Sequence, residues 1–490
     1  MSKKLTGAYM RKIIPEQVQM GEIDIAQINI ELDSRDEIPQ LLRGLQHIYC
    51  NVASRNKVFK LLWEIVPKDI NVNTGRNGMN LWRILVLGTL RLSCNWDYDK
   101  LQEIANNHYK LRQMLGHGML DFESRYSRQT LNDNLRWFTP EVLGKINQVV
   151  VNDGMGLLGK KDEVKKSHSR CDSFVLETNV HFPTDVNLLW DATRKAMQIS
   201  HRVADCLDIG GWRQTVYNIR NVKRLFRAVQ NERDRDKKSD ACLHATQQYI
   251  DTAMLHLKRA EEVAQLTKKN ESLLEMNSDI IRFVEHGKLQ IDHIIRRCFK
   301  DETIKHDEKV FSIFEEHTEW ISKGKAGVPQ ELGLRVCIVE SGSGFILHHK
   351  VMQDETDDAI AVPIVKETLE RFPYVKSCSF DKGFHSPQNQ QDLSTMLEFN
   401  ILPRKGKLNK ENKAIESSEE FVEKRRQHSA VESAINAIEN HGLDRCCDHG
   451  IEGFKRYVAL AIVARNFQLI GAILQKRELK KRASTRKQVA

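Results

Sequence analysis

The 490-residue sequence lacks several features that would place it in familiar classes of protein. Its ten cysteines include no CxxC pair and no regular spacing, which argues against a disulfide scaffold, and we expect all of them to be reduced thiols. The N-terminus has no apolar segment typical of a signal peptide. The longest apolar run, Tyr457 to Ala464, is far shorter than the roughly 20 residues that a membrane span needs. We therefore expect a cytoplasmic protein that has no membrane partner.

Charge of one sign is not strongly in excess. Lys and Arg number 75 against 66 Asp and Glu, a formal net charge of +9. This balance is compatible with a nucleic-acid partner but does not by itself indicate one, because many soluble proteins carry as much charge. Positive charge does gather in residues 471–490, where a run of Lys and Arg follows Gln475 with one acid among them, Glu478. The run predicts a disordered basic tail, which either lies along DNA phosphates or is solvated without a partner.

Helical spacing of apolar residues runs through residues 1–165. A strongly apolar helix is expected from Leu81 to Leu92, and shorter helices follow it as far as Gly116. Two more helices, Ser127 to Trp137 and Pro140 to Val151, are separated by a short break. Because the first of them carries several arginines, the pair is either a DNA-reading helix-turn-helix or an ordinary helical hairpin. We expect this region to be helical and to serve DNA binding or dimerisation.

Strand-like segments appear after residue 165 and alternate with helical ones. The expected elements are, in order, a strand at 173–180, helices over 187–305, strands at 309–314, 334–340 and 345–351, a helix at 357–372 capped by Thr356 or Asp357, strands at 375–380 and 399–403, and a long helical region from 419. This order predicts an α/β fold with a mixed sheet. We expect the sheet domain to comprise residues 166–191 and 309–470, with residues 192–308 as a helical insertion within it.

Carboxylates at strand ends are candidates for two-metal phosphoryl chemistry, which needs about three acids from distant parts of the chain because Mg²⁺ prefers hard oxygen ligands. Asp381 ends an expected strand, and Gly383 lets the chain turn sharply just beyond it. An acid in that position is costly unless it is paired or bound to metal. A turn aspartate that caps nearby amides would fit the same local sequence. Asp172 opens another expected strand, with Asp185 and Asp191 as its rivals.

Glu432 is the third candidate acid. It lies with His428 on a polar helix face, beside an apolar stripe that includes Val431 and Ile435. Ser429-x-x-Glu432 is also a capping-box pattern, in which the glutamate only bonds a backbone amide. The spacing alone leaves both interpretations open.

Basic residues accompany the candidate acids, and such residues would hold DNA phosphates beside bound metal ions. Each of them, taken alone, would also suit a solvated surface. The predicted DNA-contacting set is Lys323 and Lys325 before the expected hairpin, Lys382 after Asp381, and Arg425, Arg426 and His428 before Glu432, with Arg170 close to Asp172.

Several blocks of the sequence resemble, in the same order, those of bacterial insertion-sequence transposases. The blocks are Asn80 to Gly116 with Asn106-Asn-His108; Asp172-Ser-Phe-Val-Leu-Glu-Thr-Asn-Val-His-Phe-Pro-Thr-Asp185; Phe311-Ser-Ile-Phe314 with Ile321-Ser-Lys-Gly-Lys325 and Glu331-Leu-Gly333; Asp381-Lys-Gly-Phe-His385; and Arg425-Arg-Gln-His-Ser-Ala-Val-Glu432 with Asn440-His-Gly-Leu443. The resemblance runs from about residue 75 to residue 470. It is closest to the ISNCY group of DDE transposases.

The resemblance implies an RNase H-like mixed-sheet core with a large helical insertion and an all-helical N-terminal region. In such an enzyme Asp172, Asp381 and Glu432 would be the catalytic, metal-binding triad for two Mg²⁺ ions, with Mn²⁺ able to substitute. The implied partners are DNA, as terminal inverted repeats and as target, and a second copy of the chain in a homodimer. The implied location is the bacterial cytoplasm, in association with the nucleoid.

The sequence departs from the family at positions around the glutamate. Related transposases often carry Y-x2-R-x3-E-x6-K, and the corresponding residues here are Arg425, His428 and Glu439. The positive charge of the lysine is thus reversed and the arginine is replaced by a weaker base. Contacts to the terminal phosphates must therefore be made differently, with Arg425, Arg426 and Lys382 as candidates.

Two other functions suit the same sequence. One is a nuclease that hydrolyses DNA without joining it, and the other is an inactive DNA-binding remnant, although the presence of all three acids argues against decay. The helical insertion would contact either DNA or a partner subunit, and the sequence does not decide between them. A DNA-facing surface there would use Arg213, Arg220, Lys223, Arg224 and Arg227.

Overall fold

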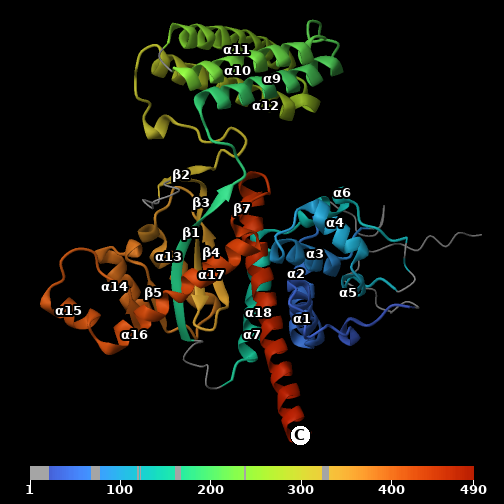
Figure 1. Cartoon of the computed structure of the whole chain (residues 1–490), viewed down its shortest axis with the longest axis vertical. Helices are drawn as coiled ribbons and strands as arrows, with labels where there is room; N and C mark the ends of the chain where they lie inside the picture. The colour runs from blue at the N-terminus through green and yellow to red at the C-terminus, as the bar shows by residue number, and fades with distance from the viewer. Residues whose placement is uncertain are drawn as a thin grey trace, which may run out of the picture. The chain divides into compact units, whose positions relative to one another are not determined.

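The chain divides into two compact units, and each is described by itself. The computed structural model describes residues 21–67, 78–118, 121, 123–159, 167–236, 239–322 and 330–489. The first unit comprises Met1–Asn179 and Ile321–Ala490, and the second comprises Val180–Trp320 (Figure 1). The second unit contains the residues 192–308 for which the sequence predicts a helical insertion.

A mixed sheet forms the centre of the first unit (Figure 1). Its central strand β1 pairs antiparallel with β3 on one side and parallel with β5 on the other, and β6 extends the sheet parallel to β5. β4 and β2 both lie against β3, and β7 pairs with the end of β1. The strands are β1 (His168–Thr178), β2 (Glu319–Ser322), β3 (Gln330–Ser341), β4 (Ile346–Val351), β5 (Ser377–Phe380), β6 (Phe399–Ile401) and β7 (Arg445–Cys446). This α/β arrangement is consistent with the RNase H-like core that the sequence predicts.

Apolar runs explain why β1 and β3 lie inside the sheet. In β3, Leu334 and the segment from Val336 to Val339 are almost fully buried, as expected for a strand with both faces covered. Helix α13 (Asp357–Arg371) packs on β3 and β4, and α17 (Ala430–Ile438) packs on β1. The hairpin between β3 and β4 turns at Gly344, which has a φ of +92° that favours glycine, so the predicted hairpin is confirmed.

Helices cover the N-terminal region, as the sequence predicts. They are α1 (Glu37–Cys50), α2 (Val52–Trp63), α3 (Leu81–Ser93), α4 (Tyr98–Asn107), α5 (Tyr109–Met114), α6 (Arg128–Leu135) and α7 (Pro140–Gly156). α6 and α7 are the expected helix pair, and the hydroxyl of Ser127 accepts a hydrogen bond from the amide of Thr130 to cap α6. α7 packs against β4 and against α18 (Gly450–Val489), so it belongs to the core of the first unit.

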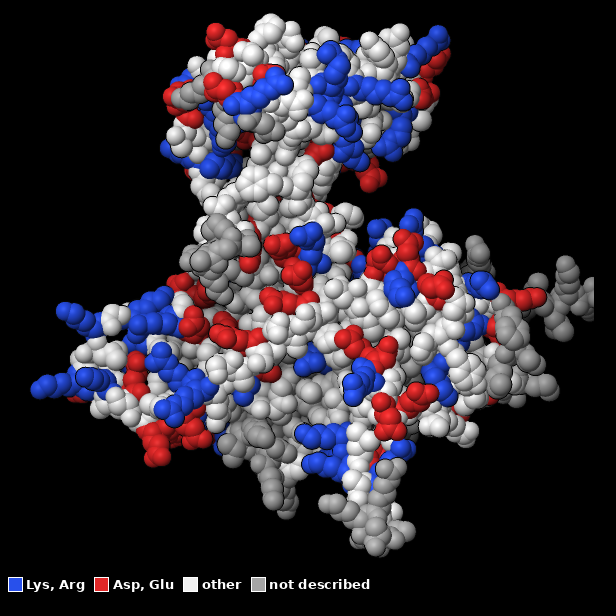
Figure 2. All heavy atoms as spheres, in the orientation of Figure 1, with Lys and Arg blue, Asp and Glu red and all other residues white. Residues whose placement is uncertain are grey.

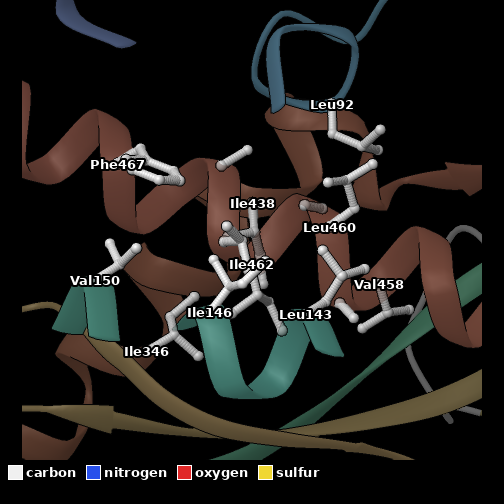
Figure 3. Close-up of a cluster of buried hydrophobic side chains, with 14 of the residues drawn as sticks. Leu92, Leu143, Ile146, Val150, Ile346, Ile438, Val458, Leu460, Ile462 and Phe467 are labelled. Carbon is white, nitrogen blue, oxygen red and sulfur yellow. The ribbon is translucent and has the colours of Figure 1, made fainter. Parts of the chain in front are cut away.

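Helix α18 is the main packing element of the first unit (Figure 3). It contacts α1, α3 and α7, and the close-up shows its Val458, Ile462 and Phe467 among the side chains of α7 and Ile346 of β4. α18 crosses α1 at very short distance, because a methyl group on Gly44 or Gly471 would overlap a backbone carbonyl of the other helix. Both glycines are therefore needed for the helices to approach this closely.

The length and composition of α18 differ from what the sequence led us to expect. The helix is long and apolar enough to cross a membrane, but 72% of its most apolar window is buried inside the protein, as in a core helix. It also continues to Val489, so the prediction of a disordered tail over 471–490 is wrong. The many Lys and Arg side chains of this segment are compatible with a helix because the side chains from Arg477 to Thr485 are exposed and keep their charges in water.

The predicted long helical region from residue 419 is interrupted. It contains α16 (Glu419–His428), α17 and a π-helical turn at Glu439–Leu443, where Gly442 has a φ of +99°. The chain then forms β7 before α18 begins. The remaining helices of this unit are the short α14 (Pro387–Met396) and α15 (Lys410–Glu416) and the 3-10 turns Ile25–Gln27 and Lys382–Phe384.

The second unit is a bundle of four helices with its own apolar core. They are α9 (Asp185–Cys206), α10 (Thr215–Arg235), α11 (Asp240–Thr267) and α12 (Leu274–Cys298), joined by the 3-10 turn Glu271–Leu273 and followed by another at His306–Glu308. The helical character predicted for this region is confirmed. The predicted strand at 309–314 is wrong, because this segment joins no sheet. The ring of Phe311 packs against Trp320, and the ring of Phe314 packs against Phe283.

Candidate active site

Asp172 and Asp381 lie next to each other across two parallel strands. The pairing of β1 with β5 places Cys171 opposite Phe380. Asp172 follows Cys171 and Asp381 follows Phe380, so the two acids are the next residues along the paired segments. Neighbouring strands are about 4.8 Å apart, and paired residues of parallel strands point to the same face. Asp172 lies in the middle of β1 and not at its start, which corrects the predicted strand boundary.

Two further acids lie near Asp172 and affect its ionisation. The pKa of Asp172 is raised to about 7, mainly by burial, with the negative charges of Asp381, Asp357 and Glu432 contributing in the same direction. The backbone amide of Ser173, which donates to Asp172 Oδ1 at 2.8 Å, acts in the opposite direction. The structure therefore places Asp172 beside Asp381, adds Asp357 to their surroundings, and leaves Glu432 near enough for its charge to act on Asp172.

Asp357 is the acid that the sequence analysis did not assign to the site. It lies in the first turn of α13, and its Oδ1 accepts a hydrogen bond of 2.6 Å from the hydroxyl of Ser173, the residue after Asp172. A methyl group on Gly383 would lie 3.3 Å from Asp357 Oδ2 and 3.8 Å from Asp381 Oδ2, so both carboxylates border the turn after β5. The local sequence predicted only a helix cap at Thr356 or Asp357, and the structure makes Thr356 the N-cap residue.

Glu432 does not form the capping box that its sequence pattern allows. Ser429 precedes α17 without a capping side-chain hydrogen bond, and its hydroxyl donates to the carbonyl of Arg426 at 2.9 Å. The Glu432 side chain is exposed on α17, the helix that packs against β1. This position leaves its carboxylate available to the site.

The two rival aspartates of the sequence analysis lie in the second unit and have cationic partners there. Asp191 accepts hydrogen bonds from Arg194 and pairs with His181, at 3.0 and 2.7 Å. Asp185 forms an ion pair of 3.2 Å with Arg297. Both serve the helical bundle.

His428 and Arg170 occupy positions behind the acids. The Nδ1 atom of His428 lies 3.1 Å from the hydroxyl of Ser379 in β5. Burial and the nearby Arg170 and Arg425 lower the pKa of His428 to about 4 against the opposing effect of Asp381, so its imidazole is neutral near pH 7. Arg170 is buried and pairs with Glu340 at 2.9 Å. The proximity of Arg170 to Asp172 in the sequence had suggested that it holds a DNA phosphate. Its guanidinium is instead engaged by Glu340 within the sheet.

Exposed basic side chains lie close to the candidate acids in the sequence, on α16 and in the turn after β5. Lys382, Arg425 and Arg426 are exposed. Lys405, which the sequence analysis did not single out, donates to the carbonyl of Gly383 at 3.0 Å, two residues from Asp381. Figure 2 shows Lys and Arg gathered over the part of the first unit where α15 and α16 lie in Figure 1. Lys323 and Lys325 lie outside the described residues.

The donor groups of this site suit a divalent cation. Asp172 and Asp381 are neighbours, and the charges of Asp357 and Glu432 also act on Asp172. Within the described part of the chain none of Asp172, Asp381 and Glu432 forms an ion pair with Lys or Arg. Hard oxygen donors with excess negative charge are what Mg²⁺ and Mn²⁺ prefer. In the same described residues, however, no three Asp, Glu, His or Cys side chains are already arranged around a metal position.

Comparisons with known proteins agree with this chemistry. Residues 298–467, which include Asp381 and Glu432 but not Asp172, match the family model described as "Transposase DDE domain". No curated protein and no solved structure matches the chain. Over these residues, which make up about a third of the chain, the protein is similar to DDE transposases, enzymes of the polynucleotidyl-transferase or nuclease class.

Proposed function

We propose that this chain cuts the ends of a mobile DNA element and joins them to target DNA at the site formed by Asp172, Asp381 and Glu432. The observation that carries the proposal is the register of β1 and β5, which makes Asp172 and Asp381 neighbours, with Asp357 and Glu432 close by. Acids from strands on both sides of a helical insertion meet there. Such convergence of unpaired carboxylates is costly for folding, so it indicates a function.

The chain's own residues would hold two divalent cations and the DNA ends. Asp172 and Asp381 are fixed by strand pairing, and Glu432 completes the set from a helix. Two Mg²⁺ ions, or Mn²⁺ in their place, would supply activation of water or of a 3′-hydroxyl and neutralise the charge that develops on the phosphate. Asp357 fixes the hydroxyl of Ser173 and thereby supports the backbone next to Asp172.

Phosphate contacts in this proposal fall to the exposed basic residues beside the acids. Lys382, Arg425, Arg426 and Lys405 would hold the DNA backbone through charge-assisted hydrogen bonds. His428 contributes as a neutral hydrogen-bonding group, because its pKa lies near 4. In this proposal these residues take the role of the family's usual lysine, whose position is occupied by Glu439 in this chain.

The decisive experiment compares Asp381→Asn with Asp358→Asn. Asp358 is an exposed acid next to Asp357 in α13, so its variant removes one charge near the site without touching the proposed ligands. With Mg²⁺ and DNA carrying the element ends, we expect Asp381→Asn to lose at least ~10³-fold in cleavage rate, since the bound metals supply several kcal/mol of barrier lowering. Asp358→Asn should cleave at nearly the wild-type rate. Cleavage by Asp381→Asn at the wild-type rate would disprove the assigned site.

Strand transfer is tested with pre-cut ends that carry a 3′-hydroxyl and a target plasmid. Joined products that depend on Asp381 support a transposase. Cleavage without joining would instead support a hydrolytic nuclease, and binding without either reaction would support an inactive remnant.

Further parts of the proposal are membership of the ISNCY group, recognition of terminal inverted repeats through the N-terminal helices, a homodimer, and action at the bacterial nucleoid in the cytoplasm. Light scattering of the protein with and without end DNA tests the dimer. Short inverted repeats on both sides of the reading frame would support the substrate.

A further inference from the structure

Helix α10 presents a strongly basic face to solvent. Arg220, Lys223, Arg224 and Arg227 are exposed and follow the i, i+3, i+4, i+7 spacing that puts residues on one side of a helix. Arg213, in the turn before the helix, is also exposed. We call these five residues the α10 basic face. The opposite side of the helix, with Val222, Leu225 and Val229, is buried in the bundle, so the direction of the basic face is fixed by packing.

Among the four helices of the second unit, the excess of positive charge lies on α10. Residues 213–227 contain five Lys and Arg and no Asp or Glu. Over its full length α10 carries six basic and two acidic residues, whereas α9 carries three of each, α12 four of each, and α11 two basic against four acidic. Figure 2 shows Lys and Arg gathered on the visible side of the four-helix unit. A bundle that needed only solubility would not concentrate one sign of charge on one of its four helices.

The charges of the α10 basic face are not neutralised within the protein. Elsewhere in the bundle arginines pair with acids, as Arg296 does with Glu308 and Arg282 with Asp279. Within the described residues none of the five cations of the α10 basic face forms an ion pair, and Arg224 bonds only to the side-chain oxygen of Asn221, at 3.0 Å. Four unpaired cations on one helix, with a fifth in the turn before it, repel one another, and a polyanion would relieve that repulsion.

The dimensions and the neighbouring side chains favour a nucleic-acid duplex. From Arg220 to Arg227 the helical part of the face extends about 10 Å at 1.5 Å per residue, a length over which one DNA strand places about three phosphates, and Arg213 adds a charge before the start of the helix. Tyr217, 68% exposed, lies on the same side and offers a hydroxyl and a ring to a phosphate or sugar. Insertion of α10 into a membrane as an amphipathic helix would require an exposed apolar face, and here the apolar face of α10 is already buried in the bundle.

We propose that the α10 basic face is a DNA-binding surface that contacts the phosphate backbone of double-stranded DNA without reading its sequence. It would give the helical insertion a role in holding the DNA on which the active site works, and so it rests on the proposed function. Backbone contacts of this kind contribute affinity and a dependence on salt, but not specificity.

The test uses the full chain with two triple variants of equal charge. Arg220→Gln, Lys223→Gln and Arg224→Gln together remove three charges from the α10 basic face. The control, Lys258→Gln, Lys268→Gln and Lys269→Gln, removes three exposed charges from α11 and the turn that follows it. All six positions are on the surface, and equal melting temperatures of the two variants and the wild type would show that the fold is retained.

The readout is the affinity for a 30-base-pair duplex between 50 and 200 mM salt, measured by fluorescence anisotropy. We expect the α10 variant to bind about 10-fold or more weakly at 100 mM salt, and the slope of log K against log salt to fall by about 2 to 3, because each lost phosphate contact removes about 0.9. The α11 variant should keep the wild-type slope. Equal slopes for both variants, or a wild-type chain that binds anionic vesicles in preference to the duplex, would overturn the inference.

Cleavage assays on the same variants separate this inference from the proposed function. If Asp381-dependent cleavage is observed while the α10 variant binds DNA like the wild type, the inference fails and the proposed function stands. If the α10 variant loses duplex affinity but the wild type has no Asp381-dependent cleavage, the inference stands and the proposed function fails.

Discussion

At the level of single residues, Asp172 links the stability of the fold to pH. In the folded protein burial, aided by three neighbouring carboxylates, raises its pKa to about 7, whereas an aspartate in an unfolded chain has a pKa of about 3.9. The folded state therefore binds the proton more tightly than the unfolded state. The stability that this group contributes is fully present below about pH 4 and is lost as the pH rises to about 7 and above.

The substitution Asp172→Asn removes that dependence. Without divalent cations we expect the variant to melt about 2–4 °C above the wild type at pH 8, because the neutral amide avoids a buried negative charge, and the difference should shrink toward pH 5. Calorimetry in the presence of a chelator at the two pH values measures it. A variant that is less stable than the wild type at pH 8 would contradict the structural account of this carboxylate. Added Mg²⁺ should stabilise the wild type more than the variant.

The same residue shows what the sequence could and could not reveal about the site. The change from helical to strand-like pattern near residue 170 and the acid at the end of β5 were visible in the sequence, and they led to Asp172 and Asp381. Asp357 was not found, because its contact with Ser173 joins residues far apart in the chain and its local pattern is that of a helix start. Long-range hydrogen bonds of this kind have no periodic signal.

At the level of elements, the regular patterns were predicted well and the irregular ones were not. Helix α3, the β3–β4 hairpin and α13 follow apolar spacing and turn residues that depend only on neighbouring positions. The start of β1 was misplaced by several residues, since Ser169 and Arg170 are polar and are buried only because β5 and Glu340 satisfy them. Such pairing is set by the tertiary structure, which overrides local propensity.

The crossing of α1 and α18 gives a prediction at this level. Gly471→Ala should lower stability by about 1–3 kcal/mol, because its methyl group would overlap the backbone of Gln40 and force the two helices apart. Gly156→Ala is the matched control, since no atom lies within 4 Å of the added methyl group and alanine favours the helix. Chemical denaturation of both variants measures the difference. Equal stability of Gly471→Ala and the wild type would show that the helices do not cross at this glycine.

At the level of the whole molecule, the strands of the candidate site lie partly before and partly after the four-helix unit in the sequence. β1 precedes Val180–Trp320 and β3 and β5 follow it, so the site forms only when strands separated by that unit pair with each other. The insertion interrupts the chain but not the sheet. This arrangement is compatible with the apolar core that the bundle builds from its own residues.

The distribution of charge over the whole chain leads to the last prediction. A net charge of +9 spread evenly over 490 residues would bind DNA weakly, but the cations are concentrated on α10, around α16 and on the exposed end of α18. If these surfaces together make about 6–10 phosphate contacts, duplex affinity should fall by about 10³–10⁵-fold between 50 and 200 mM salt, because binding releases one condensed counterion for nearly every phosphate neutralised. Anisotropy titrations of the wild-type chain across that range measure the slope. A nearly flat response would mean that the clusters are not used together, and the extended DNA interface would then have to be abandoned.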